Sequence, residues 1–242
     1  MKALELDNSL AEAHTALGFV LFYWDWDWTA AEREFLQAIE LKPSYVVVHH
    51  WYAEYLSAIG RHEQAISEIK RAQELDPLSP LFLAIGGEVC NYARRFDEAI
   101  GQCQKALELD SNFALAHGNI SNAYCGKGMF KEAQKYARLM GGDPHISLRL
   151  AYIYAAAGSR AKALEILTAR QRSKRQEPDP LSLASVYGRM GEKNLAIDWL
   201  EKARSQHDPY LVFLNVDGEF DPLRSVPRFQ AIVRGMNLPA TP

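Results

Sequence analysis

The chain has 242 residues, with 27 Lys and Arg against 30 Asp and Glu, a formal net charge of −3 and 48% apolar residues. With 15 Gly and 11 Pro, this composition excludes collagen-like and low-complexity chains and gives no sign of disorder. The longest apolar run has nine residues, far fewer than a membrane span needs, and no charged-then-apolar leader opens the chain. Three cysteines, an odd and sparse set, favour a reducing compartment, so we expect a cytoplasmic protein without a membrane anchor.

A period of 34 residues runs through the first half of the chain. Each period holds two helical patterns joined by a turn, as in residues 48–59 and 65–72 around Gly60-Arg61. Small side chains at fixed positions let two helices approach closely, and one such hairpin must stack on neighbours to bury its apolar faces. The repeated positions are Ala31, Ala65, Ala99 and Ala133, then Ala38, Ala72 and Ala106, then Pro43 and Pro77.

The unit resembles the tetratricopeptide repeat, whose slots are filled in the first unit by Leu17-Gly18, Ala31, Phe35, Ala38 and Pro43. The resemblance implies an all-α fold, a right-handed solenoid of stacked helix-turn-helix hairpins with a C-terminal capping helix. We expect residues 1–10 to be the remnant of a preceding repeat, which makes the chain a piece of a longer protein, and residues 211–242 to form the cap. The six expected units are 11–45, 46–79, 80–113, 114–143, 144–176 and 177–210.

Two departures from the period are expected to alter the stack. The first unit has one extra residue in its turn, at 24–28, where we expect Asp27 or Thr29 to cap the second helix and Glu32 to complete a capping box. The interval from Ala133 to Ala163 is four residues short. A Gly pair and Pro144 lie in that interval, which predicts a local change of superhelix pitch.

Catalytic and metal-binding patterns are absent. The chain has no phosphate-binding glycine loop, no Gly-x-Ser-x-Gly elbow and no His-Glu-x2-His pair, which predicts no catalytic residues and no cofactor. His49 and His50 point about 100° apart on a helix, so they cannot both face Glu54, and we expect no metal. We interpret His50–Glu54 as a surface pair. His14, His49 and His117 occupy the slot of a large aromatic in the repeat, so they are expected to be packing residues.

Two of the cysteines, Cys90 and Cys103, lie on the apolar stripes of one hairpin. They are expected to be buried small hydrophobes, with a redox switch as the alternative.

Charge is unevenly distributed along the chain. Residues 1–120 carry 9 Lys and Arg against 18 Asp and Glu, and residues 121–242 carry 18 against 12. The simplest interpretation is solvated outer faces; the alternative is head-to-tail association or a partner with a matching charge gradient. The basic run Arg170, Arg172, Lys174 and Arg175 is typical of a helix C-terminus, and we expect no nucleic-acid binding.

The concave groove is the expected binding surface. Glu54 and Glu88 would repel the acidic peptides that related chaperone-binding repeats hold, so the groove suits a ligand with basic groups there. The first turn contains Trp24, Trp26 and Trp28, and some of these rings are expected to cover the end of the hairpin, with a partner hot spot as the alternative. By helical phase the groove residues are Phe19, Phe22, Tyr23, His50, Glu54, Ser57, Glu88, Asn91, Tyr92, Asn122, Arg149, Tyr152, Ser185 and Arg189.

These features predict a non-enzymatic scaffold that binds a protein or peptide. Four stretches, 23–28, 49–55, 72–77 and 221–229, resemble the C-terminal repeat region of bacterial signalling proteins that carry a winged-helix, adenylate cyclase or Ser/Thr kinase domain. The resemblance implies a sensory or regulatory module. The alternatives are a regulatory segment that packs on a catalytic domain of the same chain, and a structural element that self-assembles through its truncated N-terminal end.

Overall fold

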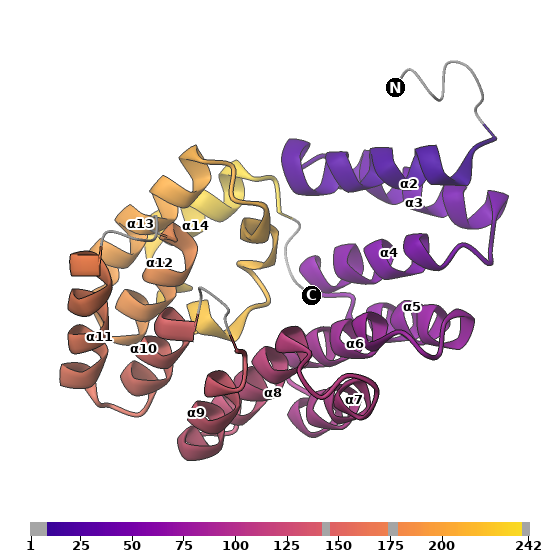
Figure 1. Ribbon diagram of the computed structural model, residues 1–242. Helices are drawn as coiled ribbons and strands as arrows, with labels where there is room; N and C mark the ends of the chain where they lie inside the picture. The colour runs from indigo at the N-terminus through magenta and orange to yellow at the C-terminus, as the bar shows by residue number, and fades with distance from the viewer. Residues whose placement is uncertain (1–8, 142–145, 174–178, 239–242) are drawn as a thin grey trace.

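The computed structural model describes residues 9–141, 146–173 and 179–238, and among these it is helical and contains no strand. The helices form antiparallel pairs that stack side by side along a curved path (Figure 1). The expected all-α solenoid is therefore confirmed. The pairs are α2 (Ala11–Val20) with α3 (Trp28–Leu41), α4 (Val46–Ala58) with α5 (His62–Leu75), α6 (Pro80–Tyr92) with α7 (Phe96–Leu109), α8 (Ala114–Gly126) with α9 (Phe130–Arg138), α10 (Ile146–Ala156) with α11 (Arg160–Ser173), and α12 (Pro180–Arg189) with α13 (Lys193–Ser205).

Small residues let the helices of one hairpin approach. Ala31, Ala65, Ala99 and Ala133 are all fully buried. In the first hairpin a Cβ built on Gly18 would lie 2.9 Å from the ring of Phe35, so the glycine makes room for the aromatic side chain. The repeated small and large residues of the sequence therefore form matched contacts across each hairpin.

The turn inside each hairpin contains a residue in the left-handed backbone region. Gly60, Gly128, Gly158 and Gly191 have φ between 74° and 84°, which costs glycine little. In the third hairpin the same position is Arg94, with φ 60°. A side chain there costs about 1 kcal/mol, so another contact must compensate for it.

The extra residue of the first hairpin is absorbed by a π-helix. Residues Leu21–Asp25 continue α2 with this wider winding, and Trp26 then turns the chain with φ 53°. Asp27 caps α3, since its side chain accepts the backbone N–H of Ala30 at 3.0 Å. The expected capping box with Thr29 is wrong, because the helix begins before Thr29 and Glu32 instead accepts hydrogen bonds from residues of the second hairpin.

The stack of inner helices changes between the fourth and fifth hairpins. α9 is shorter than α3, α5 and α7, and Gly141 follows it with φ 69°. α6 packs on α8 and α10 packs on α12, whereas α10 meets the fourth hairpin mainly through α9. Pro144 lies outside the described residues, and the expected change of pitch stays a prediction.

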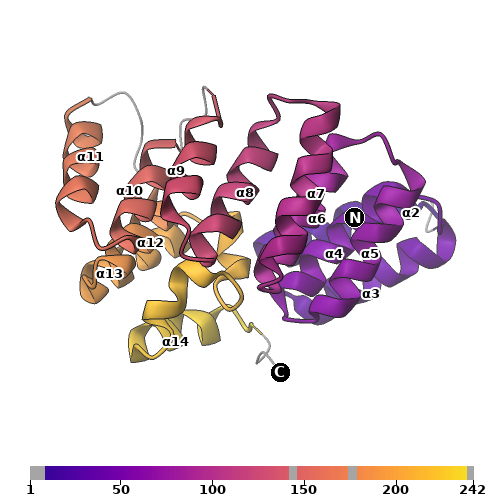
Figure 2. The ribbon, with the colours of Figure 1, turned by 90° about the horizontal axis from the view of Figure 1, so that it is seen from below.

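The C-terminal segment, residues 206–238, caps the last hairpin and also enters the inner side of the solenoid. It contains two 3-10 helices, η2 (Pro209–Phe213) and η3 (Gly218–Leu223), and then α14 (Pro227–Gly235). α14 packs on α13, as a capping helix should, and η3 packs on α12. In both ribbon views this segment, in yellow, lies between the first hairpins and the last ones (Figures 1 and 2).

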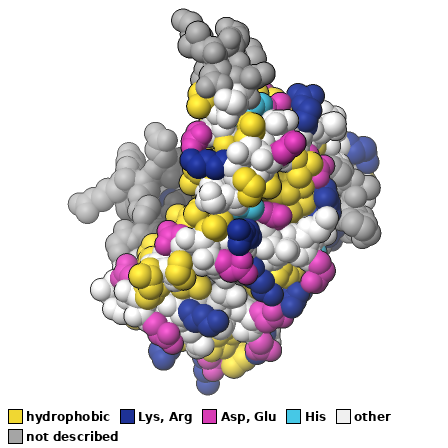
Figure 3. All heavy atoms as spheres, turned by 90° about the vertical axis from the view of Figure 1, so that its right-hand side faces the viewer, with side chains coloured by type: hydrophobic (Ala, Val, Ile, Leu, Met, Phe, Trp, Pro, Cys, Tyr) yellow, Lys and Arg dark blue, Asp and Glu magenta, His cyan; other side chains and the backbone are white. Residues whose placement is uncertain are grey.

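Ion pairs link neighbouring hairpins over the outer surface. Arg95 of the third hairpin reaches Glu63 of the second at 3.0 Å, whereas Lys42 and Glu12, 2.7 Å apart, pair within the first hairpin. Charged side chains of both signs lie interspersed on the face seen in Figure 3. Such exposed pairs contribute about 0–1 kcal/mol each, so they set the register of the stack more than its stability. Lys174 and Arg175 of the basic run lie outside the described residues. Further pairs of this kind are Arg61–Glu32, Lys127–Asp97, Arg160–Glu192 and Arg228–Asp198.

Candidate binding cavity

The aromatic residues expected in the groove are covered by the chain itself. The ring of Phe213, in η2, stacks on Tyr92 with centroids 4.8 Å apart and an interplanar angle of 12°. Its edge contacts extend to Phe22 at 6.3 Å and Tyr23 at 6.4 Å. Phe22, Tyr23 and Tyr92 therefore face inward as expected. Phe213 packs on these rings, so a ligand cannot contact them there. Phe19, half-buried, packs on the ring of Trp51 at 4.6 Å.

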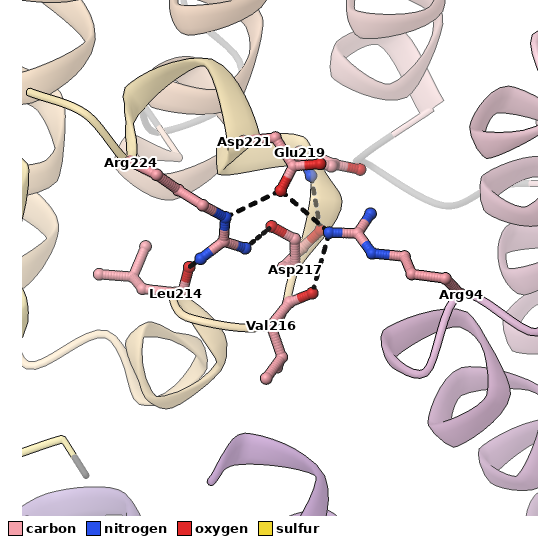
Figure 4. Close-up of polar contacts among 7 residues, drawn as sticks. All are labelled: Arg94, Leu214, Val216, Asp217, Glu219, Asp221 and Arg224. Atoms are coloured by element: carbon pink, nitrogen blue, oxygen red, sulfur yellow. Dashed lines mark hydrogen bonds and ion pairs between the residues drawn. The ribbon is translucent and has the colours of Figure 1, made fainter. Parts of the chain in front are cut away.

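A clasp between Arg94 and the C-terminal segment explains the unusual turn of the third hairpin. Arg94 Nη2 donates to Asp221 Oδ1 at 2.9 Å and to the carbonyl of Val216 at 3.4 Å (Figure 4). A Cβ built on Gly218 would lie 1.7 Å from Arg94 Nη1, so only glycine lets the guanidinium approach this closely. Arg224 donates to the same Asp221 oxygen at 2.9 Å and holds the segment in shape.

An arginine that was expected in the groove also pairs with the segment. Arg149, on α10, forms an ion pair with Glu219 of η3, and its guanidinium lies 5.9 Å from the ring centre of Tyr152. Burial opposes the charge of Arg149, but the Glu219 carboxylate outweighs it, so the pKa of Arg149 is raised. This guanidinium is thus already neutralised within the chain.

The three tryptophans of the first turn have different roles. Trp28 is buried and its Nε1 donates to the carbonyl of Met236 at 2.9 Å, 208 residues away in sequence. Trp26 stacks on His207 with centroids 6.0 Å apart. Trp24 is 47% exposed. Two of these side chains therefore hold the C-terminal segment, and one is accessible to a partner.

The sequence predicted that the pair His50–Glu54 lies on the surface. The structure shows that it is buried. His50 Nε2 lies 2.8 Å from Glu54 Oε1, and the two side chains are only 8% and 12% exposed. The Tyr23 hydroxyl also donates to this carboxylate, and burial with the Glu54 charge raises the pKa of Tyr23 well above its usual value. Because two neighbours already satisfy Glu54, it is a structural link between the first two hairpins.

Of the histidines at the repeated aromatic slot, His49 and His117 are buried and His14 is half-buried, and all three are hydrogen-bonded. His49 Nδ1 lies 2.6 Å from Glu68, and its Nε2 donates to the carbonyl of Pro43 at 2.9 Å. Burial lowers the pKa of His49, but these two partners outweigh it and the net shift is upward. In the first hairpin His14 Nδ1 lies 2.7 Å from Glu34 in the same way. His117 contacts Tyr136 with ring centroids 6.0 Å apart.

The cysteines behave as buried apolar residues. Cys90, Cys103 and Cys125 are all buried with free thiols. Burial raises the pKa of Cys90 to about 11, so its thiol stays protonated at neutral pH. Within the described part of the chain, no group of three or more His, Cys, Asp or Glu side chains could hold a metal ion.

The C-terminal segment is packed into the fold. Seven apolar side chains in its residues 209–223 are buried, and each such burial stabilises by about 1.5–3 kcal/mol. Together these burials favour the docked segment over an open groove. The seven are Leu211, Val212, Phe213, Leu214, Val216, Phe220 and Leu223.

Space remains on the inner side as two adjoining cavities. The larger has a volume of about 650 Å³ and lies between α6, α8, α10, α12 and the C-terminal segment. Trp24, Glu88, Asn122 and Arg149 line it. The smaller cavity has a volume of about 170 Å³ and shares Glu88, Asn122 and Arg149 with the larger one. Other expected residues that line the smaller cavity are Asn91, Tyr92, Tyr152 and Arg189. Two others, Ser57 and Ser185, are instead buried in the core.

Burial in these cavities disfavours the ionised form of two carboxyl groups, those of Glu88 and Asp217. Burial raises the pKa of Glu88 to about 8, and nearby Glu54 adds to this against the hydrogen bond from the Tyr92 hydroxyl. Burial and the charge of Glu219 likewise raise the pKa of Asp217 to about 7. Each of these groups therefore binds a proton more tightly in the folded chain than in the unfolded chain.

This difference predicts a pH dependence of stability. Between the unfolded pKa of about 4.5 and the folded pKa of about 8, only the folded chain keeps the Glu88 proton, so stability falls as the pH rises through that window. Glu88→Gln removes the effect while its amide oxygen still accepts from Tyr92. We expect the variant to melt at least about 2–4 °C above the parent at pH 8.5 and no higher than it at pH 4.5, the shift that 1 kcal/mol gives in a chain of this size. Parallel melting curves of both proteins across pH 4.5–8.5 would contradict the assignment.

Comparison with known proteins agrees with this architecture. The tetratricopeptide repeat family model matches residues 47–77, which form α4, α5 and their turn. Small glutamine-rich tetratricopeptide repeat-containing protein 2 of Mycosarcoma maydis is 34% identical over 93 residues. The match covers 38% of this chain and 26% of that protein, so the chain spans about a quarter of the relative's length.

Solved structures show the same fold at low identity. A tetratricopeptide repeat protein from Parabacteroides merdae matches with a TM-score of 0.68 and 15% identity over 90% of this chain and 88% of its own. PilW, a widely conserved type IV pilus biogenesis factor, matches with a TM-score of 0.60 and 18% identity over 85% of this chain and 97% of its own. No helix of the described residues is long and apolar enough to cross a membrane. The stacked hairpins and the 34-residue period are therefore similar to those of tetratricopeptide repeat proteins, which generally mediate protein–protein interaction, and residues 47–77 match that family's model.

Proposed function

We propose that this chain is a non-catalytic interaction module, the sensory or regulatory region of a larger bacterial signalling or transcription-regulating protein that works in the cytoplasm. Supporting this setting are the four stretches that resemble the repeat regions of such proteins, at 23–28, 49–55, 72–77 and 221–229. The first of these contacts the C-terminal segment, through Trp28 on Met236 and Trp26 on His207. The module would therefore present a closed, preorganised surface to its partner.

One observation carries the proposal: two exposed aromatic side chains line the larger cavity. Trp24 is 47% exposed and Tyr210 is 60% exposed, and they come from opposite ends of the chain. Large aromatic residues dominate the binding energy of many protein interfaces. Since Phe213 fills much of the groove, a partner segment would reach the inner side at this opening rather than along the whole solenoid.

The test is a double substitution, Trp24→Ala with Tyr210→Ala. Because both side chains are exposed, we expect the circular-dichroism melt to be nearly unchanged. Affinity capture from a cytoplasmic extract identifies a candidate partner, and its dissociation constant is then measured with purified protein. We expect the double variant to bind at least about tenfold more weakly, which corresponds to 1.4 kcal/mol.

The matched control is Leu78→Ala, an apolar residue that is 75% exposed in the turn between α5 and α6, away from the cavity. It should leave binding unchanged. A partner that binds the double variant as tightly as the parent would show that the interaction surface lies elsewhere.

A further inference from the structure

Acidic side chains outnumber basic ones in the lining of the larger cavity. Five carboxylates line it and Arg149 is the one Lys or Arg among its described lining residues. That guanidinium is already paired with Glu219. Charge inside a partly enclosed space is poorly screened, so the cavity as a whole attracts cations.

Two of the carboxylates face the cavity from different elements and have only uncharged partners. Glu88, on α6, accepts the Tyr92 hydroxyl at 3.0 Å. Asp217, which precedes η3, accepts the backbone N–H of Glu219 at 2.9 Å. Among the described residues neither forms an ion pair, although Arg94 and Arg149 lie near enough to Asp217 to favour its charge. Glu88 keeps a proton at neutral pH, since no described cation lies against it, and a positively charged donor would take the place of that proton.

Aromatic rings form much of the remaining wall. Trp24, Tyr92, Tyr210, Phe213 and Phe220 all line the cavity. The faces of such rings attract organic cations and also accommodate an alkyl chain. The volume of about 650 Å³ is in the range of sites for small ligands. A metal ion does not fit this lining, because no cluster of three potential ligands occurs in the described part of the chain.

We infer that this cavity binds a primary ammonium group, with the cation between Glu88 and Asp217 and its alkyl chain against the aromatic wall. The same chemistry can come from a free alkyl diamine or from a lysine side chain of a bound peptide. The inference goes beyond the proposed function, because a free diamine would occupy the cavity without any partner protein.

Isothermal titration calorimetry of the intact chain tests this at about pH 8.5, where both carboxyl groups are mostly ionised and a primary amine is still charged. The probes are 1,4-diaminobutane, the peptide Gly-Lys-Gly and the uncharged 1,4-butanediol. We expect the diamine or the peptide to bind with a dissociation constant below about 1 mM, and the diol to give no heat. Binding of the diamine alone identifies a free amine as the source, and binding of the peptide alone identifies a lysine side chain.

Substitutions of single residues test whether the amine binds at Glu88 and Asp217. Glu88→Gln and Asp217→Asn keep the size of each side chain and remove its charge, so each should weaken amine binding at least about tenfold. Glu108→Gln, an exposed position on α7 outside the cavity, should leave binding unchanged. The inference is overturned if neither amine binds, if the diol binds as well as the diamine, or if both cavity variants bind like the parent. None of these readouts needs a partner, so they are separate from the Trp24 and Tyr210 experiment.

Discussion

Phe213→Ala is expected to lower the free energy of unfolding by about 3–5 kcal/mol, the usual cost of removing a buried phenylalanine ring. Phe213 is 2% exposed and its ring lies against Tyr92, Phe22 and Tyr23. The substitution would leave a cavity where three hairpin aromatics and the C-terminal segment meet. Urea unfolding followed by circular dichroism measures the change.

Tyr210→Ala is the matched control, because it lies in the same short helix but is 60% exposed. Its effect should stay within about 0.5 kcal/mol. If both variants lost equal stability, the segment would not be docked on the inner side as described, and the groove would be open to a long peptide.

Ala99→Trp is expected to destabilise the stack by about 3 kcal/mol or more, the upper end of what overpacking costs. Ala99 is fully buried in α7, and its carbonyl oxygen would lie only 3.1 Å from a Cβ built on Gly87 of α6. An indole ring cannot enter this contact without separating the two helices. Thermal melting measures the loss.

Gln104→Trp, at an exposed position of the same helix, controls for the effect of the indole itself. It should shift the melting temperature by no more than about 2–4 °C. If Ala99→Trp melted together with this control, the close approach of α6 and α7 would be refuted.

Arg94 illustrates a signal that was visible in the sequence but not interpretable there. It stands 34 residues from both Gly60 and Gly128, in a turn position where those residues are glycine. The period alone marks it as an exception. The role of Arg94 is to contact Asp221 and Gly218, which are more than 120 residues further along the chain.

The candidate site was predicted in part. Helical phase placed Glu88, Asn122 and Arg149 on the inner side, and all three line the larger cavity. The sequence predicted the pair His50–Glu54 but placed it on the surface, because the burial of these side chains comes from the neighbouring hairpin. It also could not show that Arg149 is neutralised by Glu219, since that pairing joins α10 to a segment with no repeat pattern.

The sequence by itself determined the helical hairpins, their small-residue contacts and the absence of catalytic motifs, because these depend on neighbours a few residues or one repeat away. The tertiary structure alone decided that the solenoid closes on itself, with Trp28 bonded to the carbonyl of Met236 and Phe213 in the groove. Contacts between the two ends depend on the accumulated curvature of every hairpin between them. A small rotation per repeat, summed over the array, cannot be calculated from any local pattern of residues.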